Sequence, residues 1–372
     1  MSKLILTRFL YIYDEVCISL LTSLLKKQSL DECYFWTSEL YFSGLDKECW
    51  EFIWFVYYDF YYIDNPYFGD YISKKYSKYD FKSVITVIKN MFKLKSSPHI
   101  FITRQYNINI KDITHIFRGR KPSWLIKYPT KYHGLLRFID KKLYHFAVSS
   151  LPETISDELF EVIQTYFNIP NDKFVHITKH INSNDYDNSY HKLWSVICLF
   201  IFNPLFYTSK KKLQCACNEN EYNELLKHHN DSIPVSPKYN HSQIHKTLEY
   251  KRKYYIHSLC SSFTLLRDTS RDIYTELLYH WEYHAYSTPI WFERFNKYKT
   301  IANYESKRIE FMDDDELEEF YSLYGYEPDE QSKETQNKGL LLSDNNSWKK
   351  WYDNVFQESP LFIFNNDFKF SY

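Results

Sequence analysis

The sequence predicts a mainly helical protein, with an antiparallel helical bundle or short solenoid at its N-terminus and an α or α+β region at its C-terminus. Three observations support this fold class. Apolar residues recur at helical spacing through most of the first hundred residues. The loops between these helices are short, so successive helices are antiparallel neighbours. With only six glycines in 372 residues, the sequence also contains none of the glycine-rich phosphate-binding fingerprints.

The first two helices are expected over residues 14–27 and 30–43. In the first, the apolar side chains repeat at helical spacing and form one face. The second begins with a capping-box pattern, in which the Ser29 hydroxyl accepts a hydrogen bond from the backbone of Glu32. Gly44 follows it and supplies the left-handed conformation that commonly ends a helix.

A third helix is expected to begin at Asp46 and to end at Asp64-Asn65-Pro66. It is apolar nearly all round, which is typical of a helix buried between neighbours. A further amphipathic helix begins at Asp80 and ends before residue 96. Together these helices predict the N-terminal bundle.

Composition and charge divide the chain into four predicted parts. Residues 1–110 form the helical bundle, 111–207 a basic middle segment with helices, 208–242 a loop or linker, and 243–372 a C-terminal α or α+β region with an acidic helix. The linker is predicted because it is rich in Ser, Asn, Lys and Pro. Within the last part, residues 272–286 indicate one strong helix, and residues 302–311 a strand or hairpin arm.

The charges are balanced over the whole chain but segregated along it. The sequence has 46 Lys and Arg against 47 Asp and Glu. Residues 113–148 nevertheless hold eight basic side chains and one acidic one, whereas residues 310–334 hold eleven acidic side chains and one lysine. A second basic and aromatic run, residues 246–255, either extends the basic surface or binds the acidic segment within the same molecule.

The basic stretch has the residue types of a nucleic-acid contact. Guanidinium groups bind phosphate through two hydrogen bonds, and aromatic rings can stack on bases. The plainer alternative is that the cations form a solvated face while the aromatic rings belong to the core. The candidate contacts are Arg118, Arg120, Lys121, Trp124, Lys127, Lys131, Arg137, Lys251, Arg252 and Lys253.

Cys215, Cys217, His228 and His229 are zinc-ligand types close together in the sequence. Their spacing differs from that of zinc knuckles, and a polar loop with incidental Cys and His is the plainer alternative. We therefore predict no cofactor.

His280, Glu282 and His284 suggest either a metal site on one helix or a packed helix boundary.

The other expectations concern the cell compartment. The odd number of cysteines, seven, favours a reducing compartment. The longest strongly apolar run, residues 194–202, is about half of the ~20 residues that a membrane span needs. With no signal-peptide pattern, we expect an intracellular protein without a membrane span.

The amino-acid usage points to an AT-rich genome, because Tyr, Phe and Lys are abundant while Ala and Arg are rare. Four stretches, SLDECYFWTSELYFSGL, FRGRKPSWL, HWEYHAYSTPIWFERF and LYGYEPDEQS, together resemble an uncharacterised family of proteins of nucleocytoplasmic large DNA viruses (giant viruses). The resemblance spans roughly residues 14–332. It implies a location in the host cytoplasm or viral factory and brings no known activity with it.

From these observations we expect a non-catalytic, virus-encoded interaction protein with a protein partner. The alternative is a nucleic-acid-binding accessory factor of viral replication or transcription, which would use the basic segment. A second alternative is a metal-dependent enzyme of unrecognised type. The sequence contains no GxSxG, HExxH or EF-hand pattern, so none of these established catalytic or calcium-binding motifs supports an enzyme.

Overall fold

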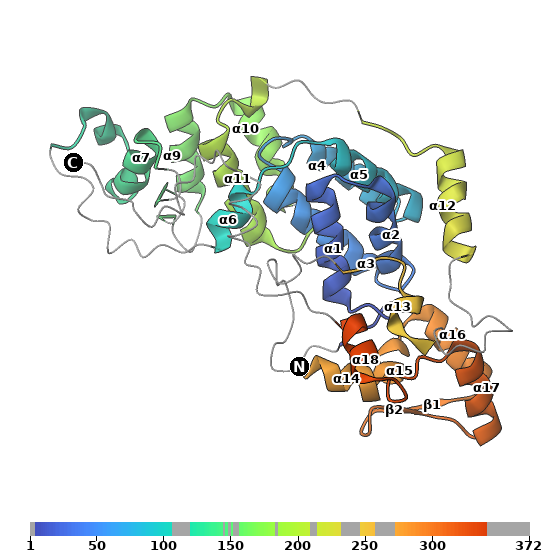
Figure 1. Cartoon of the computed structure of the whole chain (residues 1–372). Coiled ribbons are helices and arrows are strands. Elements are labelled where there is room, and N and C mark those ends of the chain that lie inside the picture. The colour runs from blue at the N-terminus through green and yellow to red at the C-terminus, as the bar shows by residue number, and fades with distance from the viewer. Residues whose placement is uncertain are drawn as a thin grey trace. The chain divides into compact units, whose positions relative to one another are not determined.

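The protein is mainly helical, as the sequence predicted. The computed structural model describes residues 4–105, 120–143, 146–147, 150–151, 156–182, 185–208, 214–231, 246–256 and 272–340. Within these ranges, the one β-sheet is the two-stranded antiparallel pair of β1 (Ile301–Asn303) and β2 (Arg308–Glu310). This hairpin lies in the stretch where a strand or hairpin arm was expected. Figure 1 colours the helices and the hairpin by their position along the chain.

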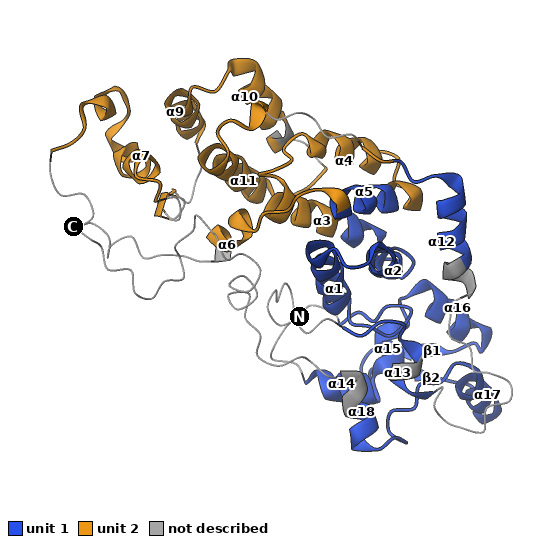
Figure 2. Ribbon diagram, turned by 45° about the horizontal axis from the view of Figure 1, so that its top comes forward, with its two compact units in different colours: residues 1–50, 84–92, 216–355 blue, residues 51–83, 93–215, 356–372 orange. Residues whose placement is uncertain are grey.

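The chain divides into two compact units, which Figure 2 colours separately. The first unit comprises residues 1–50, 84–92 and 216–355, and the second comprises residues 51–83, 93–215 and 356–372. These units differ from the four predicted parts, because the predicted N-terminal bundle contributes helices to both. Composition marks changes along the chain, whereas packing in space decides which segments form a compact unit.

The first unit begins with the helical pair α1 (Tyr13–Lys26) and α2 (Leu30–Tyr41), which pack side by side (Figure 1). The Ser29 hydroxyl accepts a hydrogen bond of 3.2 Å from the Glu32 amide, which confirms the predicted cap. Glu32 in turn accepts a hydrogen bond of 3.1 Å from the Trp36 indole. These two hydrogen bonds stabilise the N-terminal part of α2.

Apart from α1 and α2, the first unit contains a cluster of buried apolar side chains. Leu6 and Leu10 meet Trp281, Trp291 and Phe320 there. This part of the core therefore joins the start of the chain to its last third. Besides the hairpin, the remaining elements of the first unit are α12 (Glu219–Asp231), α13 (Leu248–Lys251), α14 (Ile273–Tyr279), α15 (Trp281–Ala285), α16 (Pro289–Lys297), α17 (Asp314–Tyr324) and α18 (Lys333–Leu340).

Two expectations about the first unit were wrong. Residues 219–231, within the predicted loop of 208–242, form helix α12. Its Glu221 accepts a hydrogen bond from the Tyr34 hydroxyl and pairs with Lys89 at 2.6 Å, and such tertiary contacts stabilise a helix that its polar composition did not suggest. The predicted helix over 272–286 is broken at His280, where the backbone departs from helical geometry (φ −136°, ψ 18°). The break separates α14 from α15.

The second unit is built around α11 (Ser189–Phe202), whose residues from His191 to Ile201 are nearly all buried. Helices α9 (Asp157–Phe167) and α6 (His99–Gln105) pack against α11. Helices α3 (Asp46–Val56) and α5 (Phe81–Lys93) have residues in both units. The other elements of this unit are η1 (Tyr57–Tyr61), α4 (Phe68–Tyr76), α6 (His99–Gln105), η3 (Ser123–Lys127), η4 (Thr130–Tyr132), α7 (His133–Asp140), α9 (Asp157–Phe167), α10 (Asn171–Thr178), η5 (Lys179–Asn182) and η6 (Phe206–Thr208).

Gly44 adopts the left-handed conformation predicted for it, with φ of +77°. A Cβ atom at this position would also lie 3.1 Å from two ring carbons of Pro289. We expect Gly44→Ala to lower the free energy of unfolding by about 1–2 kcal/mol, because alanine is strained at positive φ and must displace the proline ring. Urea unfolding followed by circular dichroism measures this change.

Gly134→Ala provides the matched control for Gly44→Ala. Gly134 lies in α7, and a Cβ atom added to it would meet no described heavy atom within 4 Å. Alanine there is expected to stabilise the protein by about 0.5–1 kcal/mol, since glycine is the weaker helix former. Equal effects of the two substitutions would show that the backbone conformation of Gly44 does not matter for stability.

Candidate functional site

The described part of the basic segment, residues 120–143, folds as short helical turns that leave its cations outside. Pro122 and Pro129 each precede a 3-10 turn, η3 and η4, and α7 follows at once. Leu125, Tyr128 and Tyr132 are buried and hold these turns against the second unit. Buried apolar residues and exposed basic residues alternate along the segment. One face of the segment therefore packs on the protein, and the other presents positive charge to solvent.

Most of the predicted basic contacts in this segment are exposed. Lys131 forms an ion pair with Glu158, and Arg137 is half-buried. The exposed cations that have no ion-pair partner among the described residues are Arg120, Lys121, Lys127, Lys141 and Lys142. Arg118 lies outside the described residues. The segment therefore presents a positive surface in which one lysine is already paired.

Trp124 does not stand free on this surface. Its ring centroid lies 6.2 Å from that of Tyr128 and 5.7 Å from that of Tyr166 in α9, and the residue is half-buried. The indole therefore joins helix α9 to the basic segment. Its predicted role as a base-stacking platform is not evident from this packing.

The second basic run packs against the acidic segment within the first unit. Lys246 forms ion pairs with Glu327 and, at 4.0 Å, with Glu330. The side-chain amide of Gln331 donates a hydrogen bond of 2.8 Å to the Lys246 carbonyl. Of the two arrangements considered for residues 246–255, the structure thus shows the intramolecular one at Lys246.

Lys251 and Arg252 point into the protein, so including them in the predicted contact surface was wrong. Lys251 is 3 % exposed, and its Nζ donates to the Tyr324 carbonyl at 3.1 Å. Burial lowers the pKa of Lys251 to about 7, and the neighbouring Arg294 guanidinium lowers it as well. Arg252 donates to the Leu10 carbonyl and stacks over the Tyr11 ring at 4.6 Å. Lys253 alone of the three is exposed.

The candidate zinc residues are not brought together in the described structure. The Sγ of Cys215 lies 3.2 Å from Lys93 Nζ, and Cys217 is buried. The side chains of His228 and His229 lie outside the described residues. Among the residues that the structure describes, no group of three or more His, Cys, Asp or Glu side chains is placed to hold a metal ion.

His280, Glu282 and His284 separate into three different environments at the break between α14 and α15. His280 Nδ1 donates to the Lys307 carbonyl at 3.1 Å, and His284 Nε2 contacts Glu276 Oε2 at 2.5 Å. Glu282 instead accepts a hydrogen bond from the Tyr321 hydroxyl. These side chains therefore form a packed helix boundary. Of the two interpretations that the sequence offered, a metal site on one helix or a packed boundary, the described contacts match the packed boundary.

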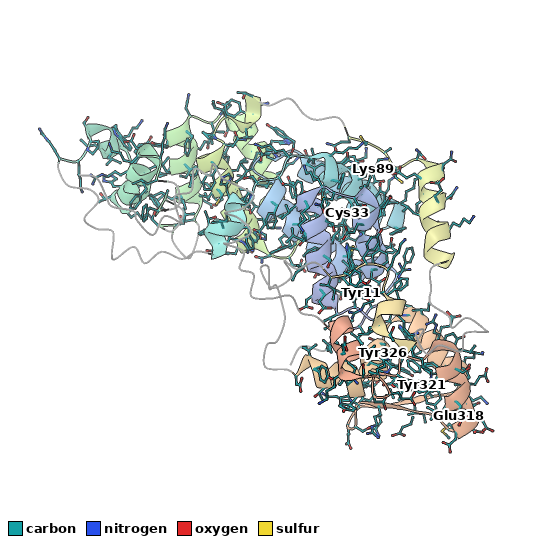
Figure 3. The ribbon with its side chains drawn as sticks, in the orientation of Figure 1. Tyr11, Cys33, Lys89, Glu318, Tyr321 and Tyr326 are labelled. Atoms are coloured by element: carbon teal, nitrogen blue, oxygen red, sulfur yellow. The ribbon has the colours of Figure 1, made fainter. Side chains whose placement is uncertain are left out.

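Sequence reasoning did not find the cavity beside Glu282. This cavity in the first unit has a volume of about 450 Å³, and both Glu282 and Tyr321 line it. Figure 3 labels Glu318, Tyr321 and Tyr326, which reach it from α17 and from the segment that follows α17. The acidic run 310–334, which also contains Tyr321 and Tyr326, was a signal of this site, but Tyr279, Trp281 and Glu282 join it from a segment distant in sequence.

The comparisons with known proteins add no relative. Neither a family model, nor a curated protein, nor a solved structure matches this chain. Among the described residues, none of the helices has both the length and the apolar character that crossing a bilayer requires.

Proposed function

We propose that this chain is a non-catalytic interaction protein encoded by a nucleocytoplasmic large DNA virus, and that it acts in the host cytoplasm or viral factory. Its contact surface is the basic segment of the second unit, residues 120–142. The observation that carries the proposal is the set of exposed cations on this segment without an ion-pair partner in the described structure. The partner is a protein with an acidic surface, because charge complementarity guides such encounters.

A second candidate function is binding of nucleic acid as an accessory factor of viral replication or transcription. It is favoured by the same exposed lysines and arginine, since cations that replace the counterions of phosphates supply most non-specific affinity. Because Trp124 packs between Tyr128 and Tyr166, this mode uses phosphate contacts without base stacking. Binding of this kind would depend little on base sequence.

One binding experiment distinguishes the two candidates. The full chain is titrated into fluorescently labelled duplex DNA, single-stranded RNA and polyglutamate at several KCl concentrations. The acidic-partner proposal predicts that only polyglutamate is retained at physiological salt. The nucleic-acid proposal predicts tighter binding of DNA or RNA, with the logarithm of the binding constant falling linearly against that of the salt concentration. Absence of binding to all three at low salt contradicts both.

We expect the double variant Lys141→Gln/Lys142→Gln to weaken polyanion binding. Each lost lysine–phosphate contact lowers the salt slope of duplex DNA by about 1. Lys131→Gln is the matched control, because Lys131 is already paired with Glu158 and should contribute less. Equal losses in the double variant and in the control, counted per lysine, would show that the unpaired cations are not the contact surface.

A further inference from the structure

The cavity beside Glu282, one of the cavities in the described part of the first unit, combines carboxylates with aromatic rings. Its volume of about 450 Å³ lies within the range of small-ligand sites. Helices α14 and α15, strand β2, α17 and the segment after α17 all contribute to its wall. Since these elements belong to one compact unit, the wall is formed within a single packed body.

The residues that line the cavity carry more negative than positive charge. Five carboxyl side chains line it, and Arg308 is the one lysine or arginine among the lining residues. Glu327 is already paired with Lys246. Glu318 and Asp329, by contrast, are exposed and have no ion-pair partner among the described residues. The cavity therefore repels anions and attracts cations.

Glu282 reaches this wall from α15. It is half-buried, and the Tyr321 hydroxyl donates a hydrogen bond to its Oε1. Burial raises the pKa of Glu282 to about 7; Asp329 adds to this rise, whereas Arg308 and the Tyr321 hydrogen bond oppose it. A cation that entered the cavity would supply the opposite charge that a desolvated carboxylate requires.

The aromatic side of the cavity suits an organic cation. Trp281 and Tyr326 are each 1 % exposed and back its wall with 5.7 Å between their ring centroids, so the lining rings that a ligand can reach are those of Tyr279 and Tyr321. Ammonium and guanidinium groups bind over the faces of such rings, and their alkyl chains pack on the apolar edges. Carboxylates beside aromatic rings thus match both parts of an alkyl cation.

We infer that this cavity binds an organic cation, namely the alkylammonium or guanidinium group of a lysine- or arginine-bearing peptide or of a free polyamine. A bare metal ion fits less well. The carboxylates line a wide cavity, and the described residues contain no group of three or more ligands close enough to share a metal ion. This site lies in the first unit, so it is independent of the basic segment proposed above.

Titration calorimetry on the full chain at low salt tests the inference with three probes. These are spermidine, a peptide of alternating lysine and glycine, and MgCl₂. Binding of spermidine or of the peptide supports the inference, and the tighter of the two identifies the source of the cation. Binding of Mg²⁺ alone, or of none of the three at millimolar concentration, overturns it.

Two substitutions assign the binding to the cavity. Glu318→Gln removes an exposed charge on α17 without removing a described hydrogen bond, and we expect about a threefold loss of affinity. Glu282→Gln keeps an oxygen that accepts from Tyr321, and we expect about a tenfold loss at pH 8. Glu316→Gln is the control, since it removes the same charge from α17 outside the cavity lining. If all three variants lose the same affinity, the cation responds only to the overall negative charge of this region, and the cavity inference is overturned.

The pH dependence provides a readout that overall charge does not predict. Because the pKa of Glu282 is raised to about 7, this group is mostly protonated at pH 6 and mostly ionised at pH 8. The groups facing it are Tyr321 on α17, Arg308 on β2 and Asp329 in the segment after α17. Affinity should therefore rise between pH 6 and pH 8, and the rise should be smaller in Glu282→Gln. In that variant only the loss of charge from Lys251, whose pKa is also about 7 and which interacts with Glu327, contributes to the rise. A rise of equal size in that variant would exclude Glu282 from the site.

Discussion

Asp59→Ala is expected to lower the free energy of unfolding by about 3–5 kcal/mol, because it leaves a guanidinium and a histidine of the second unit without their common acceptor. Asp59 lies in the π-helical turn η1 and is fully buried. Its Oδ2 accepts from Arg104 Nη2 at 2.9 Å, and its Oδ1 accepts from His191 Nε2 at 2.8 Å. Removing this carboxylate leaves the Arg104 guanidinium, whose side chain is 21 % exposed, without its ion-pair partner and leaves the buried His191 Nε2 without an acceptor.

His191 links Asp59 to Tyr186 through the two nitrogens of its ring. Burial lowers the pKa of His191, although Asp59 opposes the change, so the ring is neutral at pH 7. Since Nε2 donates to Asp59, Nδ1 is the acceptor for the Tyr186 hydroxyl at 2.9 Å. Tyr186, His191 and Asp59 are thus hydrogen-bonded in series, so loss of Asp59 disturbs the whole series.

Urea unfolding followed by circular dichroism measures the effect of Asp59→Ala. Asp140→Ala is the control, because Asp140 is exposed at the end of α7, and we expect it to change stability by less than about 0.5 kcal/mol. A loss below about 1 kcal/mol in Asp59→Ala would mean that water or a rearranged side chain replaces the carboxylate.

Glu39→Ala is expected to destabilise the first unit by a similar amount, about 3–5 kcal/mol. Glu39 is fully buried in α2, and Arg8 is 4 % exposed. The Oε2 of Glu39 accepts from Arg8 Nε at 2.7 Å, and its Oε1 accepts from the Phe9 amide at 2.9 Å. One carboxylate therefore satisfies both a side chain and the backbone at the start of the chain.

The double variant Arg8→Met/Glu39→Met separates the charge pair from the loss of packing. Methionine at both positions fills the space with apolar atoms and leaves no unpaired charge, so we expect it to be more stable than Glu39→Ala. Urea unfolding of the single and double methionine variants gives a coupling energy, expected to reach about 2 kcal/mol. Additive losses would show that Arg8 and Glu39 contribute independently.

Sequence reasoning predicted elements whose cause is local. The Ser29 cap depends on residues three apart, and the left-handed Gly44 depends on the absence of a side chain. The hairpin of β1 and β2 and the acidic start of α17 lie where their sequence patterns indicated. In each case the determining atoms lie within a few residues of one another, so pattern and structure agree.

Most features that depend on distant partners were not predicted; the exception is the pairing of Lys246 with the acidic segment, which the sequence offered as one of two arrangements. Lys251 lies in a basic and aromatic stretch, as do the exposed lysines of residues 120–142. It is nevertheless buried, and its Nζ donates to the Tyr324 carbonyl. Helix α12 is polar, and its Glu221 contacts Tyr34 and Lys89, which are far away in the sequence. Asp59 and Glu39 were identifiable only as acids within apolar stretches, without any indication of their partners.

The sequence by itself therefore determined that this protein is mainly helical, where several of its helices begin and end, and that its charges are segregated. Only the tertiary structure decided which of those charges remain free. Lys246 meets Glu327 inside one unit, whereas Lys141 and Lys142 stay exposed in the other. The physical reason is range: caps and turns involve neighbouring residues, but desolvation and ion pairing depend on whichever segment packs against a side chain.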